Sequence, residues 1–347
     1  MLVPVLLLLA IGTITASIVR APYIAYAPGS ARSTGPLVAI PGERNYRSGG
    51  EVLFTTVSVV RPTYLQAVWG WIRADVDVYP SQVIQGDQSD SENRQLNLEL
   101  MDESKLVAVR VALEQLGYEV SIKGSGALVV AVAEALPVSD LLDPGDTVTA
   151  IDGEPIALDS DLVAAVGALD PGDTVSLTVE SVDGQGRREK SRKVEARLSS
   201  RPEAKDEPML GVQVRTRAIR YEFPFTVKID SEDVGGPSAG LAWTLAVLDR
   251  LTPGSLTGGR RVAVTGEIGT GGEVNEVGGV AQKAVAAEGE GADIFIVPTG
   301  EYDEAREHAG GMRVAKVDTL DDALVVLDGL GGNALDLGTP GDDSPGA

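Results

Sequence analysis

The sequence predicts a multidomain protein of mixed α+β and α/β structure, with an N-terminal transmembrane helix, a β-rich middle domain and a C-terminal α/β domain. The chain has 347 residues, a length typical of two or three domains. Its first segment, Leu2 to Val19, is apolar and uncharged. Further on, β-branched runs entered from turn sequences are followed by apolar helical patterns. The predicted boundaries are an anchor at 1–20, a membrane-proximal α/β segment at 21–113, the β-rich domain at 114–200, the α/β domain at 201–330 and a disordered tail at 331–347.

Composition excludes several kinds of chemistry. The chain has 29 Lys and Arg against 51 Asp and Glu, a formal net charge of −22, with no Cys and one His, His308. Without Cys there is no thiol nucleophile, disulfide or thiolate metal site, and a single His cannot build a multi-histidine site. We therefore expect no metal and no cofactor, an exposed His308, and solvated acidic clusters such as Glu301-Asp303-Glu304. The negative charge repels phosphates, so we expect no nucleic-acid partner.

The apolar N-terminal segment is long enough for a membrane anchor. As a helix, its 18 residues span about 27 Å, close to the thickness of a bilayer core. The alternative is a cleaved signal peptide, because Ala25-Tyr26-Ala27 resembles a cleavage site. That site is followed by Pro28 and lies far from the apolar run. We therefore expect an uncleaved single-pass anchor in the cell membrane, with most of the chain extracytoplasmic.

The segment after the anchor predicts few regular elements. Residues 21–50 are rich in Pro, Gly, Ser and Arg and are interpreted as a spacer. Val52 to Val60 is a β-branched strand, and the polar residues from Gly86 to Asn97 indicate a loop. Apolar positions from Asp102 to Leu116 have helical spacing. We hypothesise that the strand at 52–60 belongs to the C-terminal α/β domain, which would make that domain discontinuous.

The middle domain contains a short repeat. Asp143-Pro144-Gly145-Asp146-Thr147-Val148 recurs at 170–175, and each copy is a turn that leads into a strand. Between the copies lie a tight turn at Asp152-Gly153-Glu154 and a helical pattern from Asp161 to Leu169. In this order, the elements resemble a PDZ domain.

The resemblance to PDZ domains implies a peptide-binding site. Gly124 and Gly126 precede the strand that begins at Ala127 and Leu128, where the loop that binds a peptide carboxylate would lie in this family. Such domains capture a peptide by pairing it with a strand edge. The alternative is a β domain with a packing role only, because the aromatic or leucine signature of that loop is not clear here.

In the C-terminal domain, a serine lies at the start of a helix. Ser238 is part of Gly235-Gly236-Pro237-Ser238-Ala239-Gly240, directly before an apolar run at 241–248 that predicts a buried helix. Unpaired backbone N–H groups and the positive end of the helix dipole can stabilise an anionic acyl-transfer intermediate at such a position. The alternative is a helix N-cap, the commonest reason for a serine there.

A lysine lies on an apolar helix face further along the chain. Val280, Lys283, Ala284 and Ala287 share one side of the predicted helix. Burial lowers the pKa of a lysine, and the neutral amine can act as general base for a serine. The alternative is a lysine whose stem lies on the apolar face while its ammonium group reaches solvent.

Together these motifs resemble the peptidase domain of Lon proteases over residues 205–328. The strand before Gly236-Pro237-Ser238, the segment Thr265-Gly266-Glu267-Ile268, the Val-Gly-Gly before the lysine helix and the Ile-Phe-Ile-Val-Pro strand follow the family order. With the PDZ-like domain and the anchor, the chain resembles the YlbL-type membrane-anchored PDZ–Lon serine proteases. This resemblance implies that Ser238 is the nucleophile and Lys283 the general base, supported by Thr265, Gly236 and Pro237. It also implies protein or peptide substrates and a ring-shaped homo-oligomer.

Two departures from the Lon pattern bear on function. Val234-Gly235 stands where Lon proteases commonly have Lys-Asp, and Asp233 lies two places too early to substitute for the missing acid. The sequence also lacks a Gly-x-x-x-x-Gly-Lys-Ser/Thr phosphate loop. We therefore expect an ATP-independent serine endopeptidase that cleaves unfolded or exposed segments, with the PDZ-like domain recruiting or gating substrates. The alternative is a catalytically inactive scaffold or assembly protein.

Overall fold

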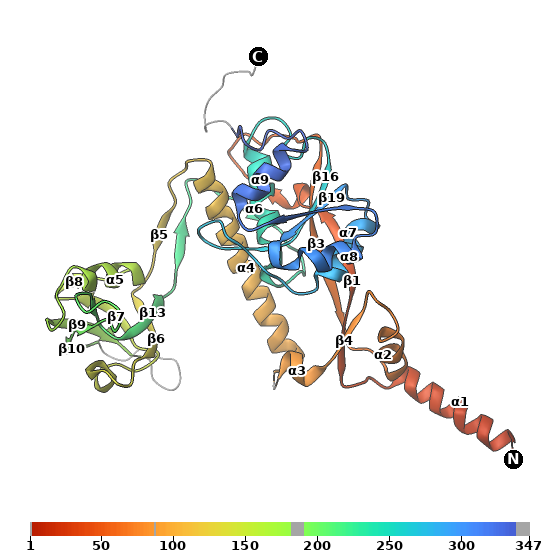
Figure 1. Cartoon of the computed structure of the whole chain (residues 1–347), viewed down its shortest axis with the longest axis horizontal. Coiled ribbons are helices and arrows are strands. Elements are labelled where there is room, and N and C mark those ends of the chain that lie inside the picture. The colour runs from red at the N-terminus through yellow and green to blue at the C-terminus, as the bar shows by residue number, and fades with distance from the viewer. Residues whose placement is uncertain (1, 87, 182–190, 338–347) are drawn as a thin grey trace. The chain divides into compact units, whose positions relative to one another are not determined.

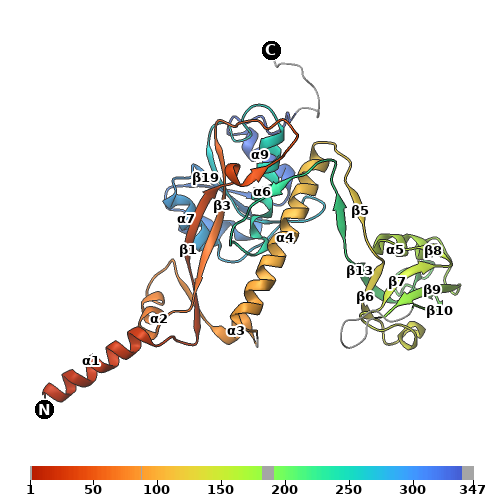
Figure 2. The same ribbon diagram turned by 180° about the vertical axis from the view of Figure 1, so that it is seen from behind.

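The computed structural model of the chain describes residues 2–86, 88–181 and 191–337. They form two compact units, which Figures 1 and 2 show from opposite sides. The first unit consists of the chain up to Glu119 and from Phe223 onward, and we call it the discontinuous unit. The second, Val120–Glu222, is the inserted unit.

A mixed six-stranded sheet lies at the centre of the discontinuous unit, in the order β20-β19-β16-β3-β1-β4 (Figure 1). Strands β3, β16, β19 and β20 run parallel, and β1 is antiparallel to both β3 and β4. The strands are β1 (Tyr23–Ser33), β3 (Glu51–Val60), β4 (Asp77–Pro80), β16 (Arg261–Val264), β19 (Ile294–Pro298) and β20 (Arg313–Val317). Because β3 pairs with β16 from Glu51 to Phe54, the strand at 52–60 lies in the same sheet as the C-terminal strands.

Helices cover both faces of this sheet. Side chains alternate along β3, so Leu53 packs with α7 on one face, whereas the Phe54 ring lies 4.9 Å from the ring of Trp243 in α6 on the other. Residues Gly240 to Leu248 of α6 are all buried, as the apolar run predicted. The helices are α1 (Leu2–Ile18), α2 (Tyr64–Gly70), α3 (Ser81–Gln85), α4 (Asp90–Gln115), α6 (Gly240–Leu251), α7 (Val280–Gly289), α8 (Tyr302–His308) and α9 (Leu320–Asp328).

Short elements complete the discontinuous unit. They are η1 (Gly35–Leu37), β2 (Val38–Ala39), β15 (Lys228–Ile229), η3 (Pro237–Ala239), β17 (Glu267–Ile268), β18 (Val274–Asn275) and η4 (Thr299–Glu301). β15 pairs with β2, and β17 pairs with β18. The predicted strand before the serine is β15, which is only two residues long.

The N-terminal region differs from its prediction in two respects. None of the helices in the described residues, α1 included, is long and apolar enough to cross a membrane, so the structure gives no support to the predicted anchor. The interpretation of residues 21–50 as a spacer is wrong, because β1 lies inside the sheet between β3 and β4. Its Pro and Gly residues fall at a β-bulge between Pro28 and Ala31 rather than in a linker.

Helix α4 is longer than its apolar pattern indicated. A polar loop was expected from Gly86 to Asn97, but the helix begins at Asp90, and residue 87 lies outside the described residues. Ser89 and Glu92 form a capping box, in which the Glu92 N–H donates to the Ser89 hydroxyl and the Ser89 N–H donates to the Glu92 carboxylate at 2.7 Å. The cap fixes the start of the helix, and the polar first turns lack the apolar periodicity that would have predicted them.

The inserted unit contains a six-stranded sheet, in which five strands follow the order β10-β9-β7-β6-β13 and β8 pairs with β7. Helix α5 packs on this sheet. The two repeat copies lead into β7 and β9, as predicted. Its elements are β5 (Ser121–Lys123), β6 (Ala127–Val132), η2 (Pro137–Asp140), β7 (Thr147–Ile151), β8 (Glu154–Pro155), α5 (Asp159–Gly167), β9 (Thr174–Glu180), β10 (Arg192–Arg197), β11 (Ser199–Ser200), β12 (Pro208–Met209), β13 (Val212–Thr216) and β14 (Arg220–Glu222). Because β13 pairs with β6, this unit extends beyond the boundary predicted at residue 200.

The last part of the described chain is packed. Ala334 is buried, and the Asn333 N–H donates to the Ser255 carbonyl at 3.2 Å. The predicted disordered tail is therefore wrong for residues 331–337, and residues 338–347 lie outside the described residues.

Candidate active site

Hydrogen bonds on two sides hold the turn that carries Ser238. Ser238 lies in η3, between β15 and α6. On one side, the Gly236 N–H donates to the Asn97 carbonyl at 2.7 Å and the Ser104 hydroxyl to the Pro237 carbonyl at 2.9 Å, both in α4. On the other, the Ser238 carbonyl accepts from the Gly266 N–H at 3.0 Å. The long helix and the segment after β16 thus fix the turn before the serine helix begins.

Lys283 lies inside the protein rather than on its surface. It belongs to α7, whose inner face packs on β1 and β3, and it is 2% exposed. Its Nζ donates a hydrogen bond to Thr265 Oγ1 at 3.2 Å. The alternative interpretation, in which the ammonium group reaches solvent, is therefore wrong.

Thr265 connects the lysine to the serine segment. It directly follows β16 and is fully buried. Its hydroxyl accepts from Lys283 Nζ and donates to the Ser238 carbonyl at 3.2 Å. Two elements far apart in sequence, α7 and η3, are thus joined through one side chain.

Burial changes the protonation of two groups at this site. Burial of Lys283 lowers its pKa from 10.5 to about 8, although the negative charge of Glu301 acts in the opposite direction. Burial of Glu301 raises its pKa to about 7, against the hydrogen bond from the Val277 N–H and the attraction of Lys283. A lysine in this environment is partly neutral near neutral pH, as a general base requires.

Glu301 is a site residue that the sequence did not predict. Its cluster was expected to be a solvated face, but η4 turns this carboxylate inward, and it is 9% exposed. Oε1 accepts from the Val277 N–H at 3.1 Å, just before the lysine helix, and Oε2 has no hydrogen-bond partner among the described residues. Three acidic residues in four positions are typical of a solvated surface. Glu301 differs from the other two only because η4 turns its side chain inward.

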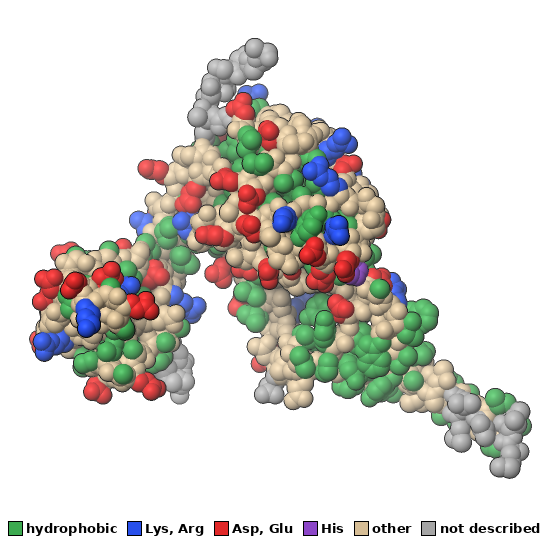
Figure 3. All heavy atoms as spheres, viewed as in Figure 1, with side chains coloured by type: hydrophobic (Ala, Val, Ile, Leu, Met, Phe, Trp, Pro, Cys, Tyr) green, Lys and Arg blue, Asp and Glu red, His purple; other side chains and the backbone are tan. Residues whose placement is uncertain are grey.

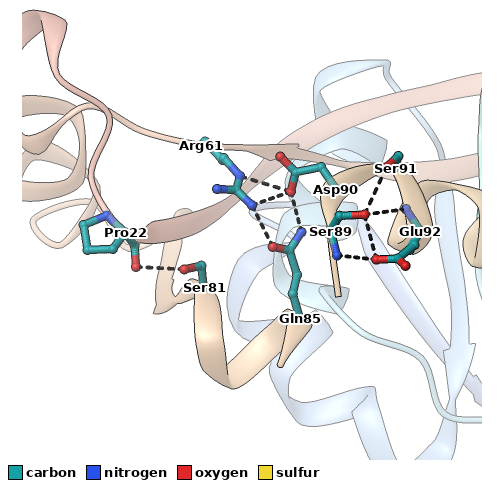
Figure 4. Close-up of polar contacts among 8 residues, drawn as sticks. All are labelled: Pro22, Arg61, Ser81, Gln85, Ser89, Asp90, Ser91 and Glu92. Atoms are coloured by element: carbon teal, nitrogen blue, oxygen red, sulfur yellow. Dashed lines mark hydrogen bonds and ion pairs between the residues drawn. The ribbon is translucent and has the colours of Figure 1, made fainter. Parts of the chain in front are cut away.

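Ser238 and Lys283 line the same cavity, which has a volume of about 710 Å³. One wall is β3 beyond its pairing with β16, from Thr55 to Val60. At its rim, Arg61 points to Asp90 and Gln85 (Figure 4), donating from Nη2 to Gln85 Oε1 at 2.9 Å. The cavity is therefore an open site with one strand edge exposed along it.

Three further residues named in the sequence analysis take no part in the contact between Lys283 and Thr265. Asp233 lines the same cavity as Ser238, but its side chain is 94% exposed and pairs with Arg94 at 3.3 Å. Gly235 packs against Asn97 of α4. His308 lies at the end of α8, where its Nδ1 is 3.0 Å from the Glu304 carbonyl.

The predicted peptide site of the inserted unit is not supported. Ala127 and Leu128 belong to β6, which is paired with β7 on one edge and with β13 on the other, so no edge is free for a peptide. Gly124 and Gly126 pack closely instead: a Cβ at Gly124 would lie 2.3 Å from the Ala157 carbonyl oxygen, and Gly126 has φ +121°. The second neighbour of β6 comes from residues 212–216, which the prediction had placed in the other domain.

One edge strand of this sheet is β13, and the other is β10. Between β13 and α5 lies a groove of about 730 Å³. Leu162 and Val166 of α5 form one side, and Met209-Leu210-Gly211-Val212 forms the other. The inserted unit thus has a strand edge beside an apolar helix face, at a different place from the one predicted.

Comparison with known families agrees with both units. Residues 231–327 match the Lon protease (S16) C-terminal proteolytic domain, and residues 114–194 match the PDZ domain. The chain therefore carries a PDZ domain and a Lon-type proteolytic domain, a combination consistent with a PDZ–Lon-type serine protease.

Individual relatives match parts of the chain. The Lon protease of Campylobacter concisus (strain 13826) is 32% identical over 110 residues, which are 30% of this chain and 13% of that protein. The PDZ domain of an SdrC-like protein from Listeria monocytogenes is 23% identical and covers 26% of this chain and 87% of that chain, with a TM-score of 0.23. A protein from Geobacillus thermodenitrificans, solved in solution, is 27% identical and covers 26% and 97%, with a TM-score of 0.21. The PDZ assignment rests on the family match and not on these superpositions.

Proposed function

We propose that the chain is an ATP-independent serine endopeptidase in which Ser238 is the nucleophile and Lys283 the general base. One observation carries the proposal: Lys283 is almost fully buried, hydrogen-bonds Thr265, and lines the cavity that Ser238 lines. A buried amine destabilises a fold, so a lysine kept at such a position favours a chemical role.

The chemistry requires only these side chains and the backbone. The neutral Lys283 amine takes the proton of Ser238 Oγ while Oγ bonds to the scissile carbonyl carbon. Backbone N–H groups around Ser238 stabilise the oxyanion. The lysine then returns the proton to the leaving amine as the C–N bond breaks, and an ester remains on Ser238. A water molecule, deprotonated by the same lysine, hydrolyses that ester and restores the serine.

The shape of the cavity supports extended, unfolded substrates. Beyond Phe54, the edge of β3 that faces β16 has no strand partner among the described residues. An extended peptide can pair with such an edge, and a folded domain cannot. Since the sequence has no phosphate loop, cleavage is proposed to depend on segments that are already unfolded.

The groove between α5 and β13 is proposed to recruit these substrates. A strand edge beside an apolar helix face suits a peptide that adds to the sheet and inserts apolar side chains. Membrane attachment through α1 and assembly into a ring stay predictions from the sequence.

An inactive scaffold is the second candidate, favoured by the exposed position of Asp233 and the missing accessory acid. Cleavage of casein without ATP distinguishes the two. We expect wild type to cleave and both Ser238→Ala and Lys283→Met to lose cleavage. Ser231→Ala is the matched control, because Ser231 is also buried in this segment but only accepts a hydrogen bond from Lys105. Equal cleavage by Ser238→Ala would refute the dyad, and no cleavage by wild type over a range of substrates and pH would favour the scaffold.

A further inference from the structure

The discontinuous unit exposes a concentrated apolar surface beside α1. Of the 25 large hydrophobic side chains that are exposed among the described residues, 18 lie before residue 85. Figure 3 shows apolar side chains gathered on this part of the molecule. We define the apolar platform as the exposed side chains at the end of β3 and on and after α2, namely Val59, Val60, Tyr64, Leu65, Val68, Trp69, Trp71 and Ile72.

The platform side chains do not serve the core of the unit. Trp69, Trp71 and Ile72 are 64%, 56% and 73% exposed, respectively. The third tryptophan, Trp243, is fully buried. An exposed apolar surface of this size is typical of an interaction site.

The platform is continuous with the apolar surface of α1. The Ala21 N–H donates to the Pro62 carbonyl at 2.9 Å and the Tyr64 N–H to the Val19 carbonyl at 3.3 Å, so the end of α1 is tied to the start of α2. Along α1, Leu6, Leu7, Ile11 and similar side chains are exposed. A partner of the platform therefore meets an uncharged helix as well.

The distribution of charged residues further limits which partners the platform can bind. The chain contains 51 acidic residues, yet none lies at 1–42 or at 52–74. The charged residues of these two segments are arginines, among them Arg20, Arg61 and Arg73. The acids that pair with Arg61 and Arg73 are Asp90, at the start of α4 (Figure 4), and Asp75, and both lie outside these segments. In a chain of net charge −22, the two segments themselves carry only positive charge.

We propose that the apolar platform docks onto the surface of a lipid bilayer that contains anionic headgroups. Tryptophan and tyrosine are enriched where protein meets the headgroup region, and arginine at the margin binds anionic lipid. This docking does not require α1 to cross the bilayer. Because Val59 and Val60 also line the cavity at Ser238, docking puts one end of that cavity next to the lipid surface.

Quenching of tryptophan by brominated lipid tests the proposal on the full chain. Vesicles of phosphatidylcholine and phosphatidylglycerol, with bromine near the headgroup end of the acyl chains, quench only indoles at the interface. We expect quenching in Trp69→Phe and in Trp71→Phe, each of which keeps one platform tryptophan and the buried Trp243. We expect none in Trp69→Phe/Trp71→Phe, which keeps only the buried Trp243.

A matched control separates the platform from the rest of the unit. Val325 on α9 is 57% exposed, close to the value of Trp71. Adding Val325→Trp to Trp69→Phe/Trp71→Phe gives an exposed indole outside the platform, which we expect to stay unquenched.

A second variant tests the apolar contact itself. In the wild-type background, Ile72→Asp removes an apolar side chain that is proposed to enter the lipid, and it should weaken binding to the anionic vesicles about tenfold.

The outcomes are distinct. If the chain binds the vesicles but Trp69 and Trp71 stay unquenched, the proposal is overturned, because α1 alone would then hold the chain on the vesicle. Equal quenching at Val325→Trp would also overturn it. If vesicles have no effect and light scattering shows dimers or larger species that Ile72→Asp dissociates, the platform binds a second copy of the chain, and the proposal is wrong. None of these readouts depends on cleavage, so they are independent of the proposed peptidase activity.

Discussion

At the scale of single residues, Lys283 combines a destabilising burial with the role of general base that we propose for it. Its pKa is about 8 in the folded chain and 10.5 for an unperturbed lysine. Because the folded value is lower, the unfolded chain binds the proton more tightly, and the fold is weakened below pH 8. This decrease in the free energy of unfolding becomes smaller as pH rises toward 10.5.

We therefore predict that Lys283→Met stabilises the fold while it abolishes cleavage. The free energy of unfolding near neutral pH should rise by roughly 1–3 kcal/mol, and the gain should shrink in alkaline buffer. Urea denaturation at several pH values measures it. Lys105→Met is the control, because Lys105 is paired with Asp102 at 2.7 Å and should give no gain. A destabilised Lys283→Met would mean that the ammonium is well compensated in the wild type.

The pH dependence of cleavage follows from the same amine. Only neutral Lys283 accepts a proton, so kcat/KM should rise with pH around a midpoint of about 8. Glu301→Gln removes a charge that raises the pKa of Lys283 and keeps an oxygen for the Val277 N–H. The midpoint should therefore move to lower pH by about 0.5–1 unit. Glu307→Gln, on the exposed side of α8, is the control. An unchanged midpoint in Glu301→Gln would show that the two groups do not interact.

The sequence was informative about residues whose neighbours are local. Spacing alone places Ser238 at a helix start and Lys283 on an apolar helix face, whereas their roles as nucleophile and general base are implied by the resemblance to Lon proteases. Glu301 could not be identified from spacing, because its inward direction depends on a single turn of η4. The structure also provides what spacing cannot, namely that Thr265 contacts both Lys283 and the Ser238 carbonyl.

At the scale of elements, Gly279 decides where the lysine helix begins. It caps α7 with φ +70°, in the left-handed region, and a Cβ there would lie 2.6 Å from Val57 Cγ1 in β3. We predict that Gly279→Ala lowers the free energy of unfolding by about 1–3 kcal/mol and slows cleavage by displacing Lys283. Calorimetry and kcat/KM measure the two effects.

Gly289 supplies the matched control at the other end of α7. No heavy atom lies within 4 Å of a Cβ built there, and its φ is outside the left-handed region. Gly289→Ala should be neutral or stabilise by up to about 1 kcal/mol. If Gly279→Ala and Gly289→Ala lose the same stability and activity, any change in α7 has this effect, and the conformation of Gly279 is not the cause.

Predictions for elements succeeded where the pattern was local and failed where pairing was distant. The repeat turns before β7 and β9 and the buried helix α6 were predicted. β1 was missed because its Pro and Gly fall at a bulge, and its strand character depends on β3 and β4. The peptide site was misplaced because β6 receives its second neighbour, β13, from residues 212–216.

At the scale of the whole molecule, the inserted unit leaves and returns to the discontinuous unit at one place. The rings of Tyr118 and Phe225 lie 5.2 Å apart, on either side of the insertion. β5 and β14 pair directly after them. The two ends of the insertion are thus close in space, as tolerated insertions require.

We predict that a short flexible linker can replace residues 120–222 without loss of the discontinuous unit. Cleavage of a short unstructured peptide should stay within about twofold of wild type, because no residue of the dyad is removed. Cleavage of proteins that the groove recruits should fall. The ratio of the two kcat/KM values measures the contribution of the inserted unit. Loss of peptide cleavage in a folded variant would show that the insertion is needed for chemistry.

The order of strands in the central sheet has a consequence for the newborn chain. β3 is made early, but its parallel partner β16 begins only at Arg261, whereas the inserted unit is continuous and can fold as soon as it leaves the ribosome. Ser238 and Lys283 both follow the inserted unit. Closing the sheet across so long a loop is slow and comes last. While it is still being synthesised, the chain can therefore hold a folded PDZ domain before Ser238 and Lys283 are brought together, so the proposed cleavage can begin only after α7 has joined the sheet.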